Sequence, residues 1–163
     1  MNNKLINLRL LNKDDLPKLV RFRNDHLIWK FTKGQGNFNK KRITIKDEIA
    51  WFKKVSNDRK RLNLAITLDD KYIGNVYFTN ITKISAEFEI FIGEKSLWAK
   101  GYGFISTKIA ISFFTLNYKI KEIYLTVRKD NIAARKLYAK CGFKLDKKYI
   151  KQDIYLMRYK IKR

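Results

Sequence analysis

This 163-residue sequence has one cysteine, one histidine and one proline, so it is poor in residues on which several kinds of chemistry depend. One cysteine cannot form an intramolecular disulfide, and one cysteine with one histidine cannot build a zinc site. A catalytic cysteine–histidine pair would need Cys141 to meet His26 in space. Cys141, however, lies at an apolar helical position, and His26 is interpreted as a surface or helix-end residue. Carboxylates, tyrosines and lysines remain as acid–base groups, and we expect no metal.

Long hydrophobic runs are also missing. No stretch approaches the roughly 20 apolar residues that cross a bilayer, and the first residues lack the charged-then-apolar order of a secretory signal. Apolar residues still make up 45% of the sequence, which excludes a disordered chain. With no repeats, low-complexity tracts or linkers, residues 1–163 are expected to form one domain, in the cytoplasm and not on a membrane.

Acidic residues are scarce: 37 lysines and arginines face 15 aspartates and glutamates, giving a net charge of +22. Such a field attracts anions, which favours nucleotide cofactors, nucleotide-linked substrates or RNA as partners. It argues against polyamines and aminoglycosides. The alternative is a compositional bias without functional meaning, because the lysines are spread along the whole chain.

Hydrophobic periodicity predicts the order β-α-α-β-β-β-α-β-α-β-β, a mixed α/β sheet with helices on both faces. A loop from Phe31 to Arg42 separates the first two helices, and Gly74 suggests a bulge or a close backbone approach. The strands are expected at 4–11, 62–68, 72–80, 84–92, 121–127, 143–152 and 154–161, and the helices after Asn12 or Asp14, at 44–56, from Gly103 to Asn117 and at 131–140.

Two helices carry apolar residues that predict their buried sides. In the later helix, Phe113 is assigned to the core. In the helix that Thr44 caps, the buried side is assigned to Ile45, Ile49, Trp51, Phe52 and Val55.

The stretch from Glu87 to Asn117 organises the rest of the chain. An alternating strand leads into a loop with Gly101-Tyr102-Gly103, and the loop opens directly into a helix. The free N–H groups and the positive dipole end of such a helix suit a phosphate or pyrophosphate. Taken alone, the same pattern also describes an ordinary tight turn.

A second motif follows about 30 residues later. Asp130 or Asn131 can cap a helix, one face of which carries apolar residues and Tyr138, and Gly142 fits the end of that helix. On pattern alone, Tyr138 could be an ordinary core aromatic. The motif is Asn131-x-x-Ala134-x-x-Leu137-Tyr138-x-x-x-Gly142-Phe143.

The two motifs together, in this order, resemble the GNAT superfamily of acetyl-coenzyme A-dependent N-acetyltransferases. The resemblance follows the element order of nearly the whole chain and is sharpest from Glu87 to Phe143. It implies a central, mostly antiparallel sheet of about seven strands, in which two neighbouring strands splay apart to form the cofactor cleft. It also implies acetyl-CoA as co-substrate.

The resemblance places the cofactor by position. Trp98 stands where the family usually has Gln or Arg, so that side-chain contact is altered, but a backbone cradle for the pyrophosphate should remain. The strand would pair with the pantetheine arm through its main chain, and Asn131 would bond the arm from the other side. The cofactor-binding residues implied are Ile90, Phe91, Ile92, Trp98, Lys100, Gly101, Tyr102, Gly103 and Asn131.

Acetyl transfer needs a neutral amine, an oxyanion stabiliser and a proton for the leaving thiolate. Tyr138 matches the family's proton donor, and a backbone N–H near Ile90 or Phe91 would polarise the carbonyl. Glu87 and Glu89 share one face of their strand, which either lines the acceptor cleft or is simply solvated. Glu87 is the first choice of base, acting through water, followed by Glu89.

The acceptor is less defined. Trp98 resembles the branch with ribosomal-protein and amino-sugar acetyltransferases, and a pair like Arg23-Asn24 recurs among the latter, so these residues are candidate substrate contacts or a solvated helix end. We expect a primary amine of a phosphate-bearing small molecule, above all a nucleotide-linked amino sugar. The alternatives are a protein amino terminus and, without catalysis, a basic RNA- or nucleotide-binding module. No specific nucleic-acid partner is predicted, and a homodimer stays open.

Overall fold

The computed structural model of the protein describes residues 4–30, 42–149 and 153–161. The expected loop from Phe31 to Arg42 lies almost wholly outside these residues. The element order agrees with the sequence, except for one additional short helix, α2. In chain order the elements are β1 Ile6–Leu10, α1 Leu16–Arg23, α2 His26–Trp29, α3 Ile45–Ser56, β2 Leu62–Leu68, β3 Lys71–Thr79, β4 Ser85–Ile92, α4 Tyr102–Asn117, β5 Glu122–Arg128, α5 Ile132–Lys140, β6 Lys144–Tyr149 and β7 Ile154–Lys160.

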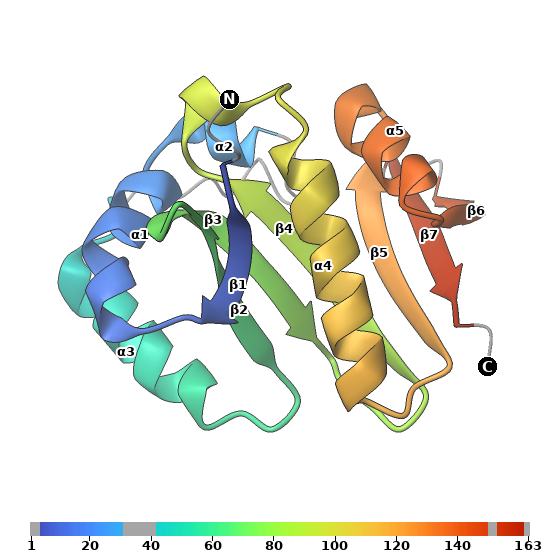
Figure 1. Ribbon diagram of the computed structural model, residues 1–163, viewed down its shortest axis with the longest axis horizontal. Coiled ribbons are helices and arrows are strands. Elements are labelled where there is room, and N and C mark those ends of the chain that lie inside the picture. The colour runs from blue at the N-terminus through green and yellow to red at the C-terminus, as the bar shows by residue number, and fades with distance from the viewer. Residues whose placement is uncertain (1–3, 31–41, 150–152, 162–163) are drawn as a thin grey trace.

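The seven strands form one sheet in the order β1-β2-β3-β4-β5-β7-β6. Every neighbouring pair is antiparallel except β4 and β5, which run parallel. These two strands pair only from Ser85 to Glu87 on β4, opposite Glu122 to Tyr124 on β5. Beyond this point they separate, toward the end of the molecule at which α4 begins (Figure 1). The predicted splayed pair in a mostly antiparallel sheet is confirmed.

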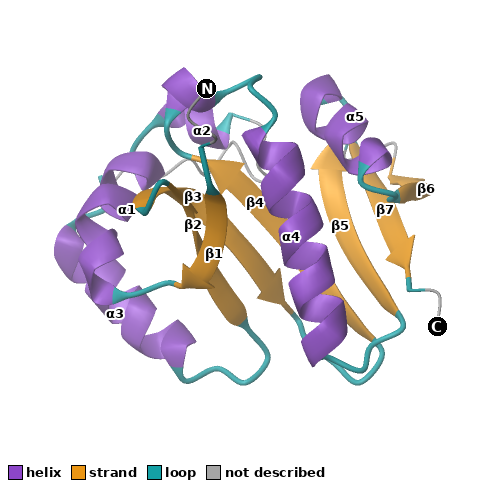
Figure 2. Cartoon of the chain, in the orientation of Figure 1, coloured by secondary structure: helices purple, strands orange, loops and turns teal. Residues whose placement is uncertain are grey.

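Helices cover both faces of the sheet, as Figure 2 shows in purple and orange. On one face, α4 and α5 pack over a large apolar core that contains Phe78, Phe88 and Phe114. On the other, α1 and α3 pack over a smaller cluster around Leu19 and Phe22. After the roles that the family resemblance implies for them, the first is called the cofactor face and the second the acceptor face. Within the described part of the chain, no helix is long and apolar enough to cross a membrane.

Local signals place several element ends as expected. Thr44 begins α3 with a capping box: its side chain accepts from the N–H of Asp47, whose carboxylate accepts from the N–H of Thr44. The β2–β3 turn places Asp69 and Asp70 at positive φ, the backbone of a type I′ hairpin turn.

Gly74 serves both functions expected of it. The register shifts beside it, and a Cβ there would lie 2.2 Å from the carbonyl oxygen of Phe91.

The predicted buried sides of two helices need correction. In α3, Ile45 and Ile49 are about 40% exposed, whereas Glu48 is only 1% exposed. In α4, Phe113 is exposed and Phe114 is buried. Since α4 is apolar on nearly all sides, periodicity could not select its inner face, which small side chains such as Ser106 and Ala110 occupy against the sheet. In α3, Glu48 turns inward toward its ion-pair partner Arg23, which is half-buried.

Candidate active site

The separation of β4 from β5 leaves part of the β4 main chain without a strand partner. Gly93 N–H donates to Ile73 on β3, whereas the carbonyl of Ile84 accepts from Lys121 just before β5. Because hydrogen bonding alternates along a strand, Phe91 faces β3, and Ile90 faces the open side. Ile90 therefore fits main-chain pairing with a pantetheine arm. The expectation that Phe91 would pair in the same way does not fit the register.

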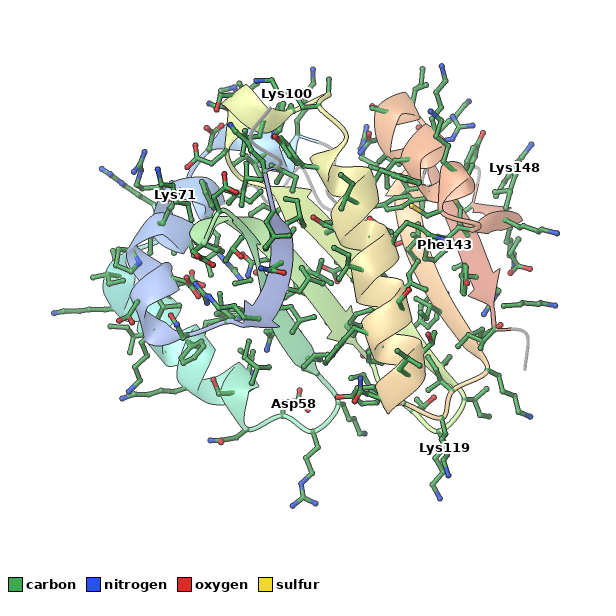
Figure 3. All side chains as sticks on the ribbon, viewed as in Figure 1. Asp58, Lys71, Lys100, Lys119, Phe143 and Lys148 are labelled. Atoms are coloured by element: carbon green, nitrogen blue, oxygen red, sulfur yellow. The ribbon has the colours of Figure 1, made fainter. Side chains whose placement is uncertain are left out.

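The loop before α4 has the geometry of an anion cradle. Gly101 is the N-cap in the left-handed conformation, φ 86°, and its carbonyl accepts from Ile105 N–H. The N–H groups of Tyr102, Gly103 and Phe104 consequently have no partner within the helix. They point outward at its positive end, beside the exposed Lys100 that Figure 3 labels at one extremity of the molecule. A pyrophosphate fits this cradle.

Gly103 also sets the spacing between α4 and α5. A Cβ at this position would lie 3.1 Å from the Leu137 side chain. This close approach brings the start of α4 next to the helix that carries Asn131 and Tyr138, so the two predicted motifs meet in space.

Trp98 has a different contact from the usual residue of the family. Its indole N–H donates to the carbonyl of Ile92 at 2.8 Å, which ties the loop to the end of β4. The indole thus positions the cradle through the protein backbone. Because the indole already bonds the carbonyl of Ile92, that carbonyl is not available to the cofactor. Ile90 is then the residue of β4 whose N–H and C=O both face the gap.

Tyr138 lies on the cofactor face, where it is 9% exposed and packs edge-on against Phe88, with ring centroids 6.3 Å apart. Burial, reinforced by the negative charge of Glu89, raises the pKa of Tyr138 well above its ordinary value. A tyrosine phenol is protonated at neutral pH even at its ordinary pKa, so this shift keeps the proton in place and adds no acid strength. Asn131 caps α5 through its side-chain oxygen, which accepts from Ala134 N–H at 3.1 Å, so its amide nitrogen is the group that can bond a ligand.

Glu87 and Glu89 lie on the acceptor face, opposite Tyr138, and differ in their surroundings. Glu87 sits where β4 still pairs with β5, and its carboxylate accepts from Asn80 Nδ2 at 2.9 Å. Glu89 lies past the last pairing position, directly across from Tyr77 on β3, and is exposed. Its charge also influences the phenol of Tyr138. Glu89 thus borders the gap more closely than Glu87 does.

The Arg23-Asn24 pair has mainly structural contacts. The Asn24 amide donates to the carbonyls of Val20 and Ile43 and accepts from Ile43 N–H, which fastens the end of α1 to the start of α3. A substrate contact by Asn24 does not fit this arrangement, because the cap already uses its amide. Arg23 turns toward the acceptor face, where its Nε lies 3.2 Å from Glu48 Oε1 and its guanidinium lies 4.3 Å from the Trp51 ring.

Cys141 and His26 belong to different parts of the fold. Cys141 is buried in the core of the cofactor face, and burial raises the pKa of its thiol. His26 is the exposed first residue of α2, as interpreted from the sequence. In the described ranges, no group of three or more His, Cys, Asp or Glu side chains is placed to hold a metal ion.

Sequence reasoning missed a polar group on the acceptor face: Glu48, Arg61, Asn63 and Tyr77. Asn63 lies opposite Tyr77, which lies opposite Glu89, so one row of side chains crosses β2, β3 and β4. The alternation of β2 and β3 could have placed Asn63 and Tyr77 on the face of Glu89, had the strand order been known. Glu48 gave no such signal, since apolar residues of α3, such as Ile45 and Ile49, indicated a different buried side.

The open edge of β4, the cradle before α4 and the buried phenol beside them define, as a class, an enzyme that binds an acyl-coenzyme A and transfers its acyl group. A family model described as an acetyltransferase (GNAT) domain matches residues 6–144, and the chain belongs to this family. It is an N-acetyltransferase that uses acetyl-CoA.

Individual relatives agree. Acetyltransferase PseH of Campylobacter jejuni is 29% identical over 140 residues, which cover 86% of this chain and 83% of that protein. A spermidine N-acetyltransferase from Vibrio cholerae, solved with CoA and spermine, is 25% identical, with a TM-score of 0.83 and 95% of each chain covered. C. jejuni PseH in complex with acetyl coenzyme A is 24% identical, with a TM-score of 0.74 over 96% of this chain and 99% of that one, and thus shares the fold.

Proposed function

We propose that this acetyltransferase acts on a primary amine of a phosphate-bearing small molecule, such as a nucleotide-linked amino sugar. The observation that carries the proposal is the row on the acceptor face, which joins the carboxylate of Glu89 to polar groups that lie farther from the gap. A carboxylate at the gap suits the amine of the acceptor. The remaining polar groups suit the polar part of the acceptor that carries this amine.

In the proposed reaction, the backbone N–H of Ile90 donates to the thioester carbonyl and stabilises the oxyanion as the amine attacks. Glu89 accepts a proton from the amine through a water molecule. When the carbon–sulfur bond breaks, Tyr138 donates its phenolic proton to the leaving sulfur. Glu89 replaces Glu87 as the first choice of base, because Glu87 is held by Asn80 away from the open part of the gap.

A polyamine acceptor is the alternative that the spermidine acetyltransferase likeness raises. A polyamine carries further ammonium groups, and the +22 field of this chain repels them. Figure 3 shows lysines on widely separated sides, for example Lys71, Lys119 and Lys148, so the field is not confined to one patch. Many carboxylates that could bind a polyamine are also already engaged, among them Asp15, Asp25, Glu94 and Glu122.

A protein amino terminus is the second alternative, since the positive field would also draw the enzyme to RNA-rich surroundings. A panel of acceptors separates the three cases: an amino-sugar nucleotide, spermidine and a peptide with a free amino terminus. Thiol release from acetyl-CoA is the readout. We expect the highest kcat/KM with the amino-sugar nucleotide. Turnover of spermidine or the peptide, with none of the nucleotide, would contradict the proposal.

A further inference from the structure

Buried polar atoms without a hydrogen-bond partner gather on the acceptor face. The described residues contain six such side-chain atoms, and only Ser106 Oγ belongs to the cofactor face. Such atoms are costly and are uncommon in native structures, so a concentration of them calls for a ligand, ordered water or a functional role. The other five are Arg23 Nε and Glu48 Oε1, which lie 3.2 Å apart as an ion pair, and Arg61 Nε, Asn63 Oδ1 and the Tyr77 hydroxyl.

Three of these residues form one group at the outer end of the row. Asn63 and Tyr77 are direct cross-strand partners, and the Arg61 guanidinium lies 6.0 Å from the centre of the Tyr77 ring. Tyr77 is 4% exposed, whereas Arg61 and Asn63 are half-buried and reach solvent. Solvent therefore reaches the group at Arg61, whereas Tyr77 is enclosed by the protein.

Positive and negative charge lie at opposite ends of the row, with Arg61 near β2 and Glu89 on β4. Arg23 and Glu48 lie close enough to offset each other. In the part of the chain that the structure describes, Arg61 has no carboxylate within ion-pair distance. Glu89 supplies negative charge at the other end, on β4. Arg61 directly precedes β2, and β2 and β4 are two strand spacings apart, which is about 10 Å.

We propose that Arg61, together with Asn63 and Tyr77, forms an anion subsite that binds the phosphate of the acceptor while Glu89 faces its amine. Arg61 supplies a planar, permanently charged group suited to phosphate oxygens. The Tyr77 ring lies beside this guanidinium, and Asn63 Oδ1 can accept from a hydroxyl or amide of the same ligand. This inference rests on the proposed function and names the residues that would give it selectivity. A second ammonium group at Arg61 would be repelled, which excludes polyamines.

The test is binding of UDP-N-acetylglucosamine to the protein saturated with CoA, measured by titration calorimetry. CoA occupies its own phosphate cradle, and the probe has no free amine, so binding is measured without turnover. We expect Arg61→Gln to weaken binding about 10- to 100-fold, the loss typical of a hydrogen bond to a charged group. The affinity of Arg61→Lys should lie between those of the wild type and Arg61→Gln, because lysine keeps the charge but lacks the planar guanidinium.

Arg59→Gln is the matched control, because Arg59 is an exposed arginine two residues away with the same change in net charge. It should leave binding within about twofold of the wild type. Equal losses in Arg59→Gln and Arg61→Gln, or no binding by the wild type, would overturn the subsite. Thermal unfolding checks the fold of each variant. If Arg61→Gln does not fold, Asn63→Asp must weaken binding in its place, because it brings a negative charge toward the phosphate.

The titration and the thiol-release assay together separate this inference from the proposed function. If binding depends on Arg61 but no amino-sugar nucleotide is acetylated, the anion subsite stands and the proposed acceptor is wrong. If an amino-sugar nucleotide is acetylated with equal kcat/KM by wild type and Arg61→Gln, the acceptor stands and the subsite is wrong.

Discussion

The two faces of the central sheet are packed in different ways. The cofactor face has a large core in which Phe78, Phe88 and Phe114 are each 1% exposed or less. The acceptor face has a smaller apolar cluster, and beside it the partly satisfied group of Arg23, Glu48 and Tyr77. The first arrangement gains stability from burial, whereas the second retains polar groups at a cost. The first face therefore supports the fold, and the second is the face on which we propose that the acceptor is recognised.

The largest effect is expected from Phe114→Ala on the cofactor face. The Phe114 ring is fully buried and stacks on Phe78 at 3.8 Å and on Tyr118 at 4.1 Å. Removing it should lower the free energy of unfolding by about 3–5 kcal/mol. Urea denaturation measures this loss. Phe113→Ala, at an exposed neighbouring position, should cost less than about 1 kcal/mol. Equal losses would show that the face was assigned wrongly.

Tyr138→Phe tests whether the cofactor face also contributes to chemistry. Removal of the phenolic proton should lower kcat about 100-fold, equivalent to about 2.7 kcal/mol in the barrier, with little change in KM for acetyl-CoA. Steady-state kinetics give both values. Tyr159→Phe is the control, because Tyr159 contacts Phe143 in the same core. A decrease of less than threefold in Tyr138→Phe would exclude this proton donor.

Glu89→Gln and Glu87→Gln compare two carboxylates of one strand on the acceptor face. Glu89→Gln should lower kcat/KM roughly tenfold, less than a direct base usually contributes, because a water molecule relays the proton. Glu87→Gln should have the smaller effect, since Asn80 already binds this side chain beside the paired part of β4. The pH–rate profile distinguishes a base from a binding group. The reverse order of effects would restore Glu87 as the base.

A smaller effect concerns the pH dependence of stability on the acceptor face. Desolvation raises the pKa of Glu48 despite the nearby charge of Arg23. A carboxyl group with a raised pKa in the folded state stabilises the protein below its unfolded pKa, and this contribution is lost as pH rises through the folded pKa. The unfolding free energy of the wild type should therefore fall relative to that of Glu48→Gln from pH 4 to pH 7. A rise over this range would mean that the ion pair outweighs desolvation.

Much of the fold followed from the sequence because its signals are local. Thr44 and Asn131 cap helices where their side chains predicted, and two aspartates form the hairpin turn. The sequence predicted less about features that depend on tertiary packing. The apolar surface of α4 does not indicate which side is buried, and the partners that draw Glu48 inward and engage Asn24 come from other elements. The cradle before α4 was predictable for the same local reason as the caps, whereas the row across β2, β3 and β4 required the strand order.

The most direct test of the account is amide hydrogen exchange at Ile90 and Phe91, with and without acetyl-CoA. Ile90 N–H lies on the open side of β4, and Phe91 N–H lies on the side paired with β3. Exchange at Ile90 should therefore slow markedly when acetyl-CoA binds, while Phe91 exchanges slowly in both states. Unchanged exchange at Ile90 in the saturated protein would contradict the placement of the pantetheine arm in the gap between β4 and β5.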